Sequence, residues 1–389
     1  MQRLFMNPAM QQDSLYSEGQ ILSLRRGLAA RRDISTWPGY APTPLRTLDA
    51  LASRLGVEAI YYKDESARFG LKSFKALGGA YAVSRLLQHA LSEVRDGRES
   101  VELFSEQARK IASSFTVACA TDGNHGRSVA WGAQTFGCQC VIFLHEGVSA
   151  AREAAIAAYG ARIVRTPGNY DDSVRAASRA AQAHGWHVVS DTSYPGYLSV
   201  PRDVMQGYST LMFEVEQQLP LDRLPTHGFI QGGVGGLAAA VCAHWWERHG
   251  TSRPRLIVVE PDAADCLYRS AEHGEPVALH GALNTVMAML ACGEVSSLAW
   301  DVLSKGAHAF MRIDDEVIAP TMRLLAAQHI VGGESGVAGL AALTLAAQDA
   351  TMRERLGLNG ASRVFVIGTE GDTDPVLYRE LVEGSRQLA

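Results

Sequence analysis

The sequence predicts an α/β fold built from doubly wound parallel sheets. Apolar runs typical of buried strands alternate along the chain with longer segments that have the apolar spacing of helices. The 389 residues suffice for about two or three domains, and 47% of them are hydrophobic while 20% are charged. This composition excludes a disordered or fibrous protein. We therefore expect a globular α/β protein.

The expected elements follow in chain order. The first forty residues are polar and predict an irregular arm on the surface, ended by the proline-rich segment 37–44. The expected strands are short apolar or β-branched runs at 59–63, 116–120, 140–144, 162–166, 187–190, 228–231, 256–260 and 364–367. The expected helices, with apolar residues three or four apart, are 74–87, 124–136, 150–159, 171–183, 204–218 and 236–247. The charged segment 91–112 predicts an exposed helix or insertion.

Charge and cysteine content exclude several classes of protein. The 36 basic and 41 acidic residues leave a net charge of −5, so neither nucleic acid nor an anionic membrane is an expected partner. The six cysteines are irregularly spaced, which predicts reduced buried thiols and no metal site. The chain also lacks a secretory signal and an apolar run long enough to span a bilayer. We expect a soluble, cytoplasmic protein.

A glycine-rich loop joins an expected strand to an expected helix at residues 231–238. Gly232, Gly233, Val234, Gly235 and Gly236 would let backbone N–H groups approach an anion at the positive end of the helix, which predicts a phosphate site. Together with Ala238 and Glu260, the same glycines also match a dinucleotide-binding fingerprint. From this loop alone, a nicotinamide dinucleotide, another phosphate ligand and a plain tight turn all remain open.

Two further glycine-bearing loops lie at strand-to-helix junctions. Lys75 stands at the start of an apolar helix, where the helix dipole and burial disfavour its charged form and make it a candidate nucleophile. The segment 120–127 carries polar groups that could grip a carboxylate, although an asparagine or aspartate before a helix is also an ordinary cap. Three such junctions predict a ligand at the carboxyl ends of the strands.

These segments resemble the fold-type II family of pyridoxal-phosphate enzymes, which includes threonine and serine dehydratases and the tryptophan synthase β chain. The shared motifs are Ser-Phe-Lys at 73–75, Thr-Asp-Gly-Asn-His at 121–125 and the glycine loop 232–236. The resemblance implies that Lys75 carries the cofactor aldehyde beside Phe74 and that Asn124 contacts the ring hydroxyl. It also implies that the glycine loop binds the cofactor phosphate.

Within this family the chain is most similar to the diaminopropionate ammonia-lyases, from about residue 35 to near its end. That resemblance implies αβ-elimination of D- or L-2,3-diaminopropionate, through aminoacrylate, to pyruvate and ammonia, with Asp122 and Lys75 as bases on opposite faces of the cofactor. The implied substrate-binding residues are Thr121, Asp122, Gly123, His125 and Asp191. Two carboxylates would favour a dicationic substrate over a neutral hydroxy amino acid. A serine or threonine dehydratase, a lyase for another β-substituted amino acid, and a nucleotide-binding oxidoreductase are the alternatives.

The resemblance also implies an organisation and one departure from the family. The implied large domain comprises 1–80, with 1–40 as an N-terminal arm, and 192–389; the smaller domain is 81–191, and the protein is a homodimer. In the tryptophan synthase β chain a serine meets the pyridine nitrogen, whereas Gly368 stands at that place here. Thr369 is the nearest hydroxyl, and we expect it to contact the cofactor.

Overall fold

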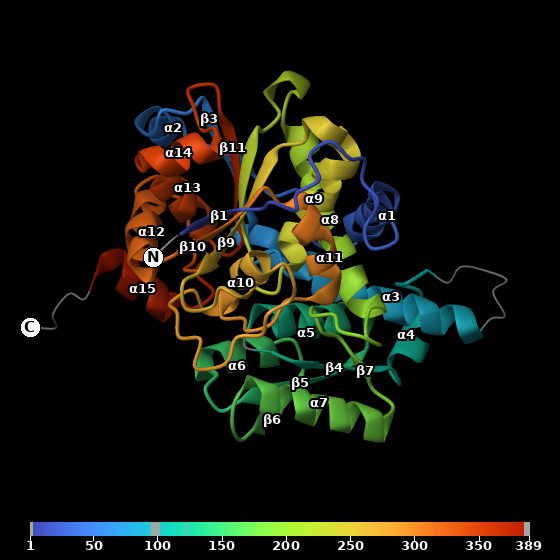
Figure 1. Ribbon diagram of the computed structural model, residues 1–389. Coiled ribbons are helices and arrows are strands. Elements are labelled where there is room, and N and C mark those ends of the chain that lie inside the picture. Colours follow the sequence, from blue (N-terminus) through green and yellow to red (C-terminus); the bar gives the residue numbers. More distant parts are fainter. Residues whose placement is uncertain (1–2, 95–101, 122, 385–389) are drawn as a thin grey trace, which may run out of the picture. The chain divides into compact units, whose positions relative to one another are not determined.

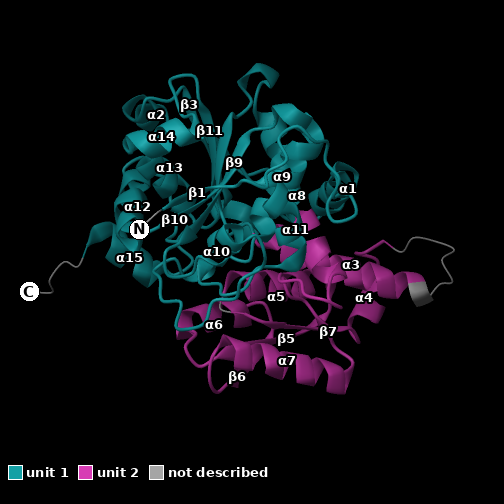
Figure 2. Ribbon diagram, in the orientation of Figure 1, with its two compact units in different colours: residues 1–74, 208–389 teal, residues 75–207 magenta. Residues whose placement is uncertain are grey.

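The computed structural model describes residues 3–94, 102–121 and 123–384. The chain divides into two compact units, which Figure 2 colours separately: residues 1–74 with 208–389, and residues 75–207. The chain passes between these units at the Phe74–Lys75 bond and within α8 (Ser199–Gln218). The smaller domain expected from the sequence, 81–191, spans a narrower range than the second unit.

The first unit contains a seven-stranded sheet in the order β1-β10-β9-β8-β11-β3-β2. Its five inner strands are parallel, and the two edge strands β1 and β2 run antiparallel to their neighbours. The strands are β1 (Leu4–Met6), β2 (Leu45–Thr47), β3 (Ala59–Asp64), β8 (His227–Gln231), β9 (Arg255–Pro261), β10 (Ala309–Ile313) and β11 (Arg363–Gly368). The predicted parallel α/β sheet is confirmed, with antiparallel edges in addition.

Helices cover both faces of this sheet. Figure 1 shows α12, α13 and α14 on one face and α9 and α11 on the other. The α-helices are α1 (Leu24–Ser35), α2 (Asp49–Leu55), α9 (Gly236–His249), α10 (Cys266–His273), α11 (Ser297–Gly306), α12 (Ile318–Ala326), α13 (Ala338–Gln348), α14 (Ala350–Leu356) and α15 (Pro375–Glu383). Short 3-10 helices are η1 (Glu65–Gly70), η2 (Leu221–Arg223), η3 (Gly250–Ser252), η4 (Ala288–Leu290) and η5 (Asp315–Val317). Because helices cover both faces of the sheet, the side chains on both sides of the inner strands are buried, and these strands are continuous apolar runs in the sequence.

The N-terminal segment is not the irregular arm that its polar sequence predicted. Within residues 3–40, β1 pairs with β10 and α1 forms a regular helix. The Ser23 side chain accepts a hydrogen bond from the Arg26 N–H and so begins the helix, while Gly27, Ala30 and Ile34 form its buried face. The prediction was wrong because only this narrow stripe of small and apolar residues is buried, among many exposed polar ones.

The second unit contains a four-stranded, fully parallel sheet in the order β6-β5-β4-β7. Its strands are β4 (Thr116–Ala120), β5 (Gln139–His145), β6 (Arg162–Thr166) and β7 (His187–Val188), and its further helices are α3 (Ala76–Val94), α4 (Glu106–Ala112), α5 (Asn124–Phe136), α6 (Ala150–Ala157) and α7 (Tyr170–His184). Helix α3 packs closely on α5 because Gly132 brings the two backbones together; a Cβ at Gly132 would lie 2.8 Å from the Ala80 Cα. Of the expected exposed segment 91–112, residues 95–101 lie outside the described residues. In the part of the chain that is described, no helix has the length and apolar character needed to cross a membrane.

Candidate functional site

Lys75 lies in the second unit, immediately before the first residue of α3. Its Nζ is 2.6 Å from the Asp191 Oδ2, and the two side chains are only 20% and 16% exposed. Asp191 follows β7 in the chain, so the fold brings together two residues that are 116 positions apart. The structure therefore pairs the predicted nucleophile with a predicted substrate-binding carboxylate.

His125 completes this group in the second unit. Its Nε2 donates to the Val189 carbonyl at 3.0 Å, so the neutral ring presents an unprotonated Nδ1, 3.7 Å from the Asp191 Oδ2. This Nδ1 is buried and has no hydrogen-bond partner among the residues that the structure describes. It is thus an acceptor that a ligand could satisfy.

The charges of this group follow from its burial. Burial alone would raise the pKa of Asp191, but the charges of Lys75 and His125, together with the hydrogen bond from Lys75, hold it well below its ordinary value. Burial lowers the pKa of His125, and so does Lys75, although Asp191 opposes the shift. At neutral pH the site therefore holds a carboxylate beside a neutral imidazole, which suits the binding of an ammonium group.

The loop before α5 is held by Thr121. Its Oγ1 accepts hydrogen bonds from the N–H groups of Gly123 and Gly126, at 3.1 and 3.0 Å, and so fixes the turn that begins the helix. Asn124 is the first residue of α5 and is buried. Asp122, the predicted second base, lies outside the described residues. The substrate contacts expected of Thr121 and Gly123 stay predictions.

One side chain near Asp191 was absent from the predicted site residues. The Tyr197 hydroxyl accepts from the Ser190 N–H at 3.0 Å and donates to the Val188 carbonyl at 2.8 Å. It thereby anchors the backbone just before Asp191. The Tyr-Pro-Gly-Tyr segment 194–197 is typical of a loop. No local sequence pattern indicates that the hydroxyl of its second tyrosine forms hydrogen bonds with the backbone of residues 188 and 190.

In the first unit, the predicted glycine loop connects β8 to α9. The Gly232 N–H donates to the Val259 carbonyl at 2.7 Å and the Gly235 N–H to the Gly232 carbonyl at 3.1 Å. Gly233 and Gly235 have φ values of +58° and +96°, which favour glycine. Gly235 is the N-cap and has no side chain to cap α9, whereas serines cap α1, α4 and α6. The residues of this loop therefore fit a phosphate group at the start of α9.

Glu260 does not fill the acidic position of a dinucleotide site. It is fully buried, and its carboxyl oxygens accept hydrogen bonds from the N–H groups of Leu267 and Tyr268 at 2.9 and 2.7 Å. This carboxyl is occupied within the fold and lies away from solvent. The dinucleotide interpretation of the glycine loop therefore lacks the acidic residue that it requires.

The position of Gly368 has a steric cause. A Cβ added there would lie 2.0 Å from the Tyr62 Oη, so a serine cannot stand at this place unless the tyrosine moves. The next residue, Thr369, is buried, and its carbonyl accepts a hydrogen bond from the Phe74 N–H at 3.0 Å. Phe74 in turn packs on Tyr208 with ring centroids 4.7 Å apart. These contacts fix the chain immediately before Lys75.

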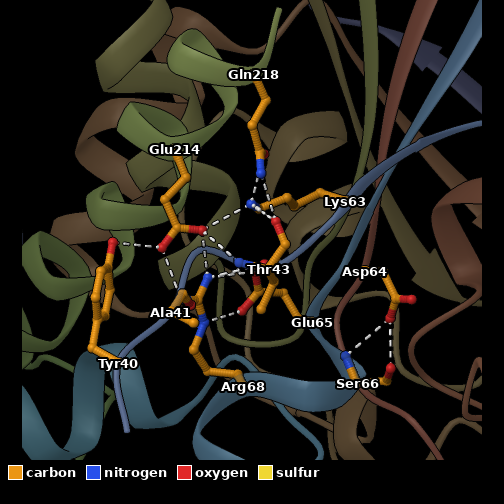
Figure 3. Close-up of polar contacts among 10 residues, drawn as sticks. All are labelled: Tyr40, Ala41, Thr43, Lys63, Asp64, Glu65, Ser66, Arg68, Glu214 and Gln218. Atoms are coloured by element: carbon orange, nitrogen blue, oxygen red, sulfur yellow. Dashed lines mark hydrogen bonds and ion pairs between the residues drawn. The ribbon is translucent and has the colours of Figure 1, made fainter. Parts of the chain in front are cut away.

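A buried ion-pair network holds the segment that leads to Phe74. Figure 3 shows Lys63 and Arg68 pointing toward the Glu214 carboxylate. Glu214 Oε2 lies 2.8 Å from Lys63 Nζ and 2.7 Å from Arg68 Nη2, and Arg68 Nε donates to Glu65 at 2.8 Å. These four side chains, two cations and two carboxylates, are at most 1% exposed. The balanced charges tie η1 and β3 to α8.

Comparisons with known proteins agree with this arrangement. The model of the family described as pyridoxal-phosphate dependent enzyme matches residues 36–370. The chain is 44% identical to a diaminopropionate ammonia-lyase of Escherichia coli K12 over 361 residues, which cover 90% of each chain. It is 38% identical to one of Salmonella typhimurium, covering 95% of this chain and 96% of that one. A crystal structure of the Escherichia coli enzyme, in complex with an aminoacrylate-PLP azomethine reaction intermediate, matches with a TM-score of 0.87 at 40% identity and covers 98% of this chain and 97% of its own.

Proposed function

We propose a function from the premise that this chain belongs to the pyridoxal-phosphate-dependent enzymes and, within them, to the diaminopropionate ammonia-lyases. The function is the conversion of 2,3-diaminopropionate to pyruvate and ammonia. The reaction is an αβ-elimination: the α-proton and the β-amine leave, and the product 2-aminoacrylate hydrolyses to pyruvate and a second ammonia. Pyridoxal phosphate is the cofactor, and when bound it supplies the electron sink that stabilises the charge left at the α-carbon. The chain's own residues supply binding, orientation and proton transfer.

The buried Lys75–Asp191 pair is the observation that supports this function best. The Lys75 amine is the group that would bond to the cofactor aldehyde, and it would then no longer offer an ammonium to Asp191. The Asp191 carboxylate would then face the site without its cation, and a cation supplied by the substrate could take that place. The β-ammonium of diaminopropionate is such a cation, whereas the β-hydroxyl of serine is neutral.

We assign the remaining cofactor contacts by residue. The loop formed by Gly232, Gly233, Val234, Gly235 and Gly236 would bind the phosphate, and the absence of a side-chain cap on α9 supports this assignment. The Gly232 and Gly235 N–H groups donate within the fold, so Gly233, Val234 and Gly236 would supply the N–H groups that contact the phosphate. Asn124 would contact the ring hydroxyl, Phe74 would flank Lys75, and Thr369 would offer the hydroxyl nearest the pyridine nitrogen. A Thr369→Val variant with an unchanged cofactor spectrum and unchanged rate would contradict the last assignment.

The proposed bases are Lys75 and Asp122, one for each enantiomer of the substrate. The remaining predicted contacts to the substrate are Thr121, Gly123 and His125. Replacement of Asp122 by Asn should lower kcat for the D-isomer by about 10²-fold or more, with a smaller effect on the L-isomer. Full activity of this variant on the D-isomer would exclude Asp122 as its base.

The function is tested by comparing substrates on one preparation of holoenzyme. D-diaminopropionate, L-diaminopropionate, L-serine and L-threonine are supplied separately, and the 2-oxo acid formed is measured together with ammonia. We expect kcat/KM for a diaminopropionate isomer to exceed that for serine by about 10²-fold or more, because only the former satisfies the site's carboxylates. Two ammonia molecules should appear for each pyruvate. A preference for serine or threonine would identify a dehydratase instead.

We further propose that the enzyme is a homodimer, as the resemblance to fold-type II enzymes implies, and that it is cytoplasmic, as its sequence composition predicts. Light scattering of the purified holoenzyme should give twice the chain mass of 41.9 kDa. A monomer mass that persists at high protein concentration would contradict the dimer. Recovery of the native protein with the membrane or exported fraction of its cells would contradict the location.

A further inference from the structure

A cavity of about 860 Å³ lies in the first unit, at the ends of the parallel strands opposite to the glycine loop. The starts of β8, β9 and β11 contribute His227, Arg255 and Arg363 to its wall. The glycine loop follows the other end of β8, which at about 3.3 Å per residue places the two sites roughly 15 Å apart. The volume lies within the usual range for small-molecule sites. This cavity is thus separate from the proposed phosphate loop.

The charged groups that line the cavity are all basic. They are the four arginines Arg253, Arg255, Arg355 and Arg363, and among the described residues the lining contains no aspartate or glutamate. Two histidines, His227 and His308, also line the cavity. Arg363 pairs with Glu58 at 3.0 Å. Among the described residues the other three arginines have no carboxylate partner. The wall therefore carries net positive charge, although Glu58 pairs with Arg363 and the charge of Asp13 acts on Arg253.

Neutral carbonyl groups orient these arginines without compensating their charge. Arg255 Nη1 donates to the Leu356 carbonyl at 2.5 Å, and Arg253 Nη2 to the Gln11 carbonyl at 2.6 Å. The Arg253 guanidinium also lies over the Trp246 ring, 4.4 Å from its centroid. Arg253 is 5% exposed, and its buried Nε has no hydrogen-bond partner among the described residues. Arg253 Nη1 also donates to the carbonyls of Gln12 and Gly250 at 3.1 and 3.0 Å, so both of its Nη atoms are engaged within the fold. Arg255 and Arg355 are therefore the guanidinium groups best able to bind a phosphate or carboxylate.

The histidines do not share this charge. His227 Nε2 donates to the Leu356 carbonyl at 3.0 Å, and His308 Nδ1 accepts from the Leu256 N–H, so both rings are engaged as neutral groups. Burial lowers the pKa of His308 to about 3, and the neighbouring arginines Arg253 and Arg255 contribute to the shift. An anion would have to be bound by the arginines, while a cationic amine such as diaminopropionate would be repelled.

We propose that this cavity binds a small organic polyanion, a phosphate-bearing metabolite of nucleotide size, at a site distinct from the catalytic one. The guanidinium forks of Arg255 and Arg355 match phosphate oxygens. Arg355 is exposed, and its one hydrogen bond to the described residues is a long one of 3.4 Å to the Leu4 carbonyl, so its side chain can turn toward a ligand. The apolar walls formed by Leu224, Pro225 and Pro254 suit the uncharged part of such a compound.

The test measures binding to the holoenzyme by calorimetry, with ATP, AMP, inorganic pyrophosphate, citrate and uncharged adenosine as separate probes. We expect saturable binding of ATP or AMP, and none of adenosine. Binding of citrate alone would overturn the assignment to phosphate. The absence of saturable binding of every probe up to millimolar concentration would overturn the site itself.

Variants then locate the binding. Arg355→Gln should weaken nucleotide binding by about tenfold, the effect expected for one charged hydrogen-bonding group. Arg54→Gln removes the same charge from an exposed position on α2 outside the cavity, so it should leave binding unchanged. Because Arg355 is exposed, its variant should keep the wild-type melting temperature. Equal weakening by both variants, or no weakening by Arg355→Gln, would contradict the proposal.

Discussion

Asp191 is the residue on which we propose that the substrate preference depends. It is buried beside Lys75 and His125 and stays ionised. Its replacement by Asn keeps the shape and removes the charge that faces a β-ammonium. We expect kcat/KM for diaminopropionate to fall by roughly 10²-fold and that for serine to change far less. Steady-state kinetics on both substrates measures this difference.

Asp171→Asn provides a matched control for this prediction. Asp171 is an exposed aspartate in the first turn of α7, in the same unit. Its variant should retain wild-type kinetics on both substrates. A parallel loss of activity toward diaminopropionate and serine in Asp191→Asn would show that Asp191 does not select the β-ammonium.

Glu260 makes the stability of the fold depend on pH. Burial raises its pKa from 4.5 to about 8, although hydrogen bonds from the N–H groups of Leu267 and Tyr268 oppose the shift. At a pH between these two pKa values, Glu260 has lost its proton in the unfolded chain but keeps it in the folded chain. The contribution of Glu260 to stability is therefore fully present below pH 4.5 and is lost as the pH rises toward 8.

Urea unfolding of the wild type and of Glu260→Gln at pH 5, 6.5 and 8 tests this expectation. The free energy of unfolding of the wild type, relative to the variant, should fall by roughly 1 to 4 kcal/mol from pH 5 to pH 8. A relative stability of Glu260→Gln that is independent of pH would contradict the assignment.

At the scale of elements, the ion-pair network joins β3, η1 and α8. Glu214→Gln leaves Lys63 and Arg68 buried with one carboxylate between them, and Glu65 cannot compensate both. We expect a loss of about 3 to 5 kcal/mol in the free energy of unfolding. Glu58→Gln, which breaks partly exposed pairs with Arg223 and Arg363, should cost less than about 1 kcal/mol. Similar losses in the two variants would contradict a structural role for the network.

Local sequence predicted those elements whose burial leaves an apolar pattern. The inner strands β3, β8, β9 and β11 and the helices α5 and α9 were predicted within a few residues of their bounds. Strand β10 was missed because it contains Arg312, whose charge is paired at 2.8 Å with Asp265, a residue 47 positions away. The edge strands β1 and β2 were missed because three residues carry too little pattern to recognise. Each of these elements depends on contacts that are distant in the sequence.

The candidate site was predictable to a similar extent. Glycine loops and a lysine at strand-to-helix junctions predict where the ligands bind, and these positions stay predictions. The motif resemblance implied pyridoxal phosphate, which the family match confirms. Neither could indicate that Tyr62 fills the space beside Gly368 or that Thr121 holds its own loop, because both facts arise from packing and hydrogen bonding in the folded chain.

At the scale of the whole molecule, the chain changes unit at the residue that we propose to hold the cofactor. The bridge between Ser73 and Glu370 and the hydrogen bond from the Phe74 N–H to Thr369 hold the preceding residues to the first unit. Lys75 itself begins the second unit. The family resemblance implied a boundary at residue 80, and that boundary stays a prediction. The pairing of residues 73 and 74 with residues almost 300 positions away leaves no local signal in the sequence.

The central claim is that the amine of Lys75 holds the cofactor, and borohydride reduction of the yellow holoenzyme followed by peptide mass mapping tests it most directly. We expect the phosphopyridoxyl group on the peptide that contains Lys75, retained in Lys72→Gln, whose lysine pairs with Asp372 at 2.8 Å. Lys75→Ala should be colourless and unlabelled. A label at Lys72 or at any other lysine, or a holoenzyme that borohydride leaves unlabelled, would contradict the claim.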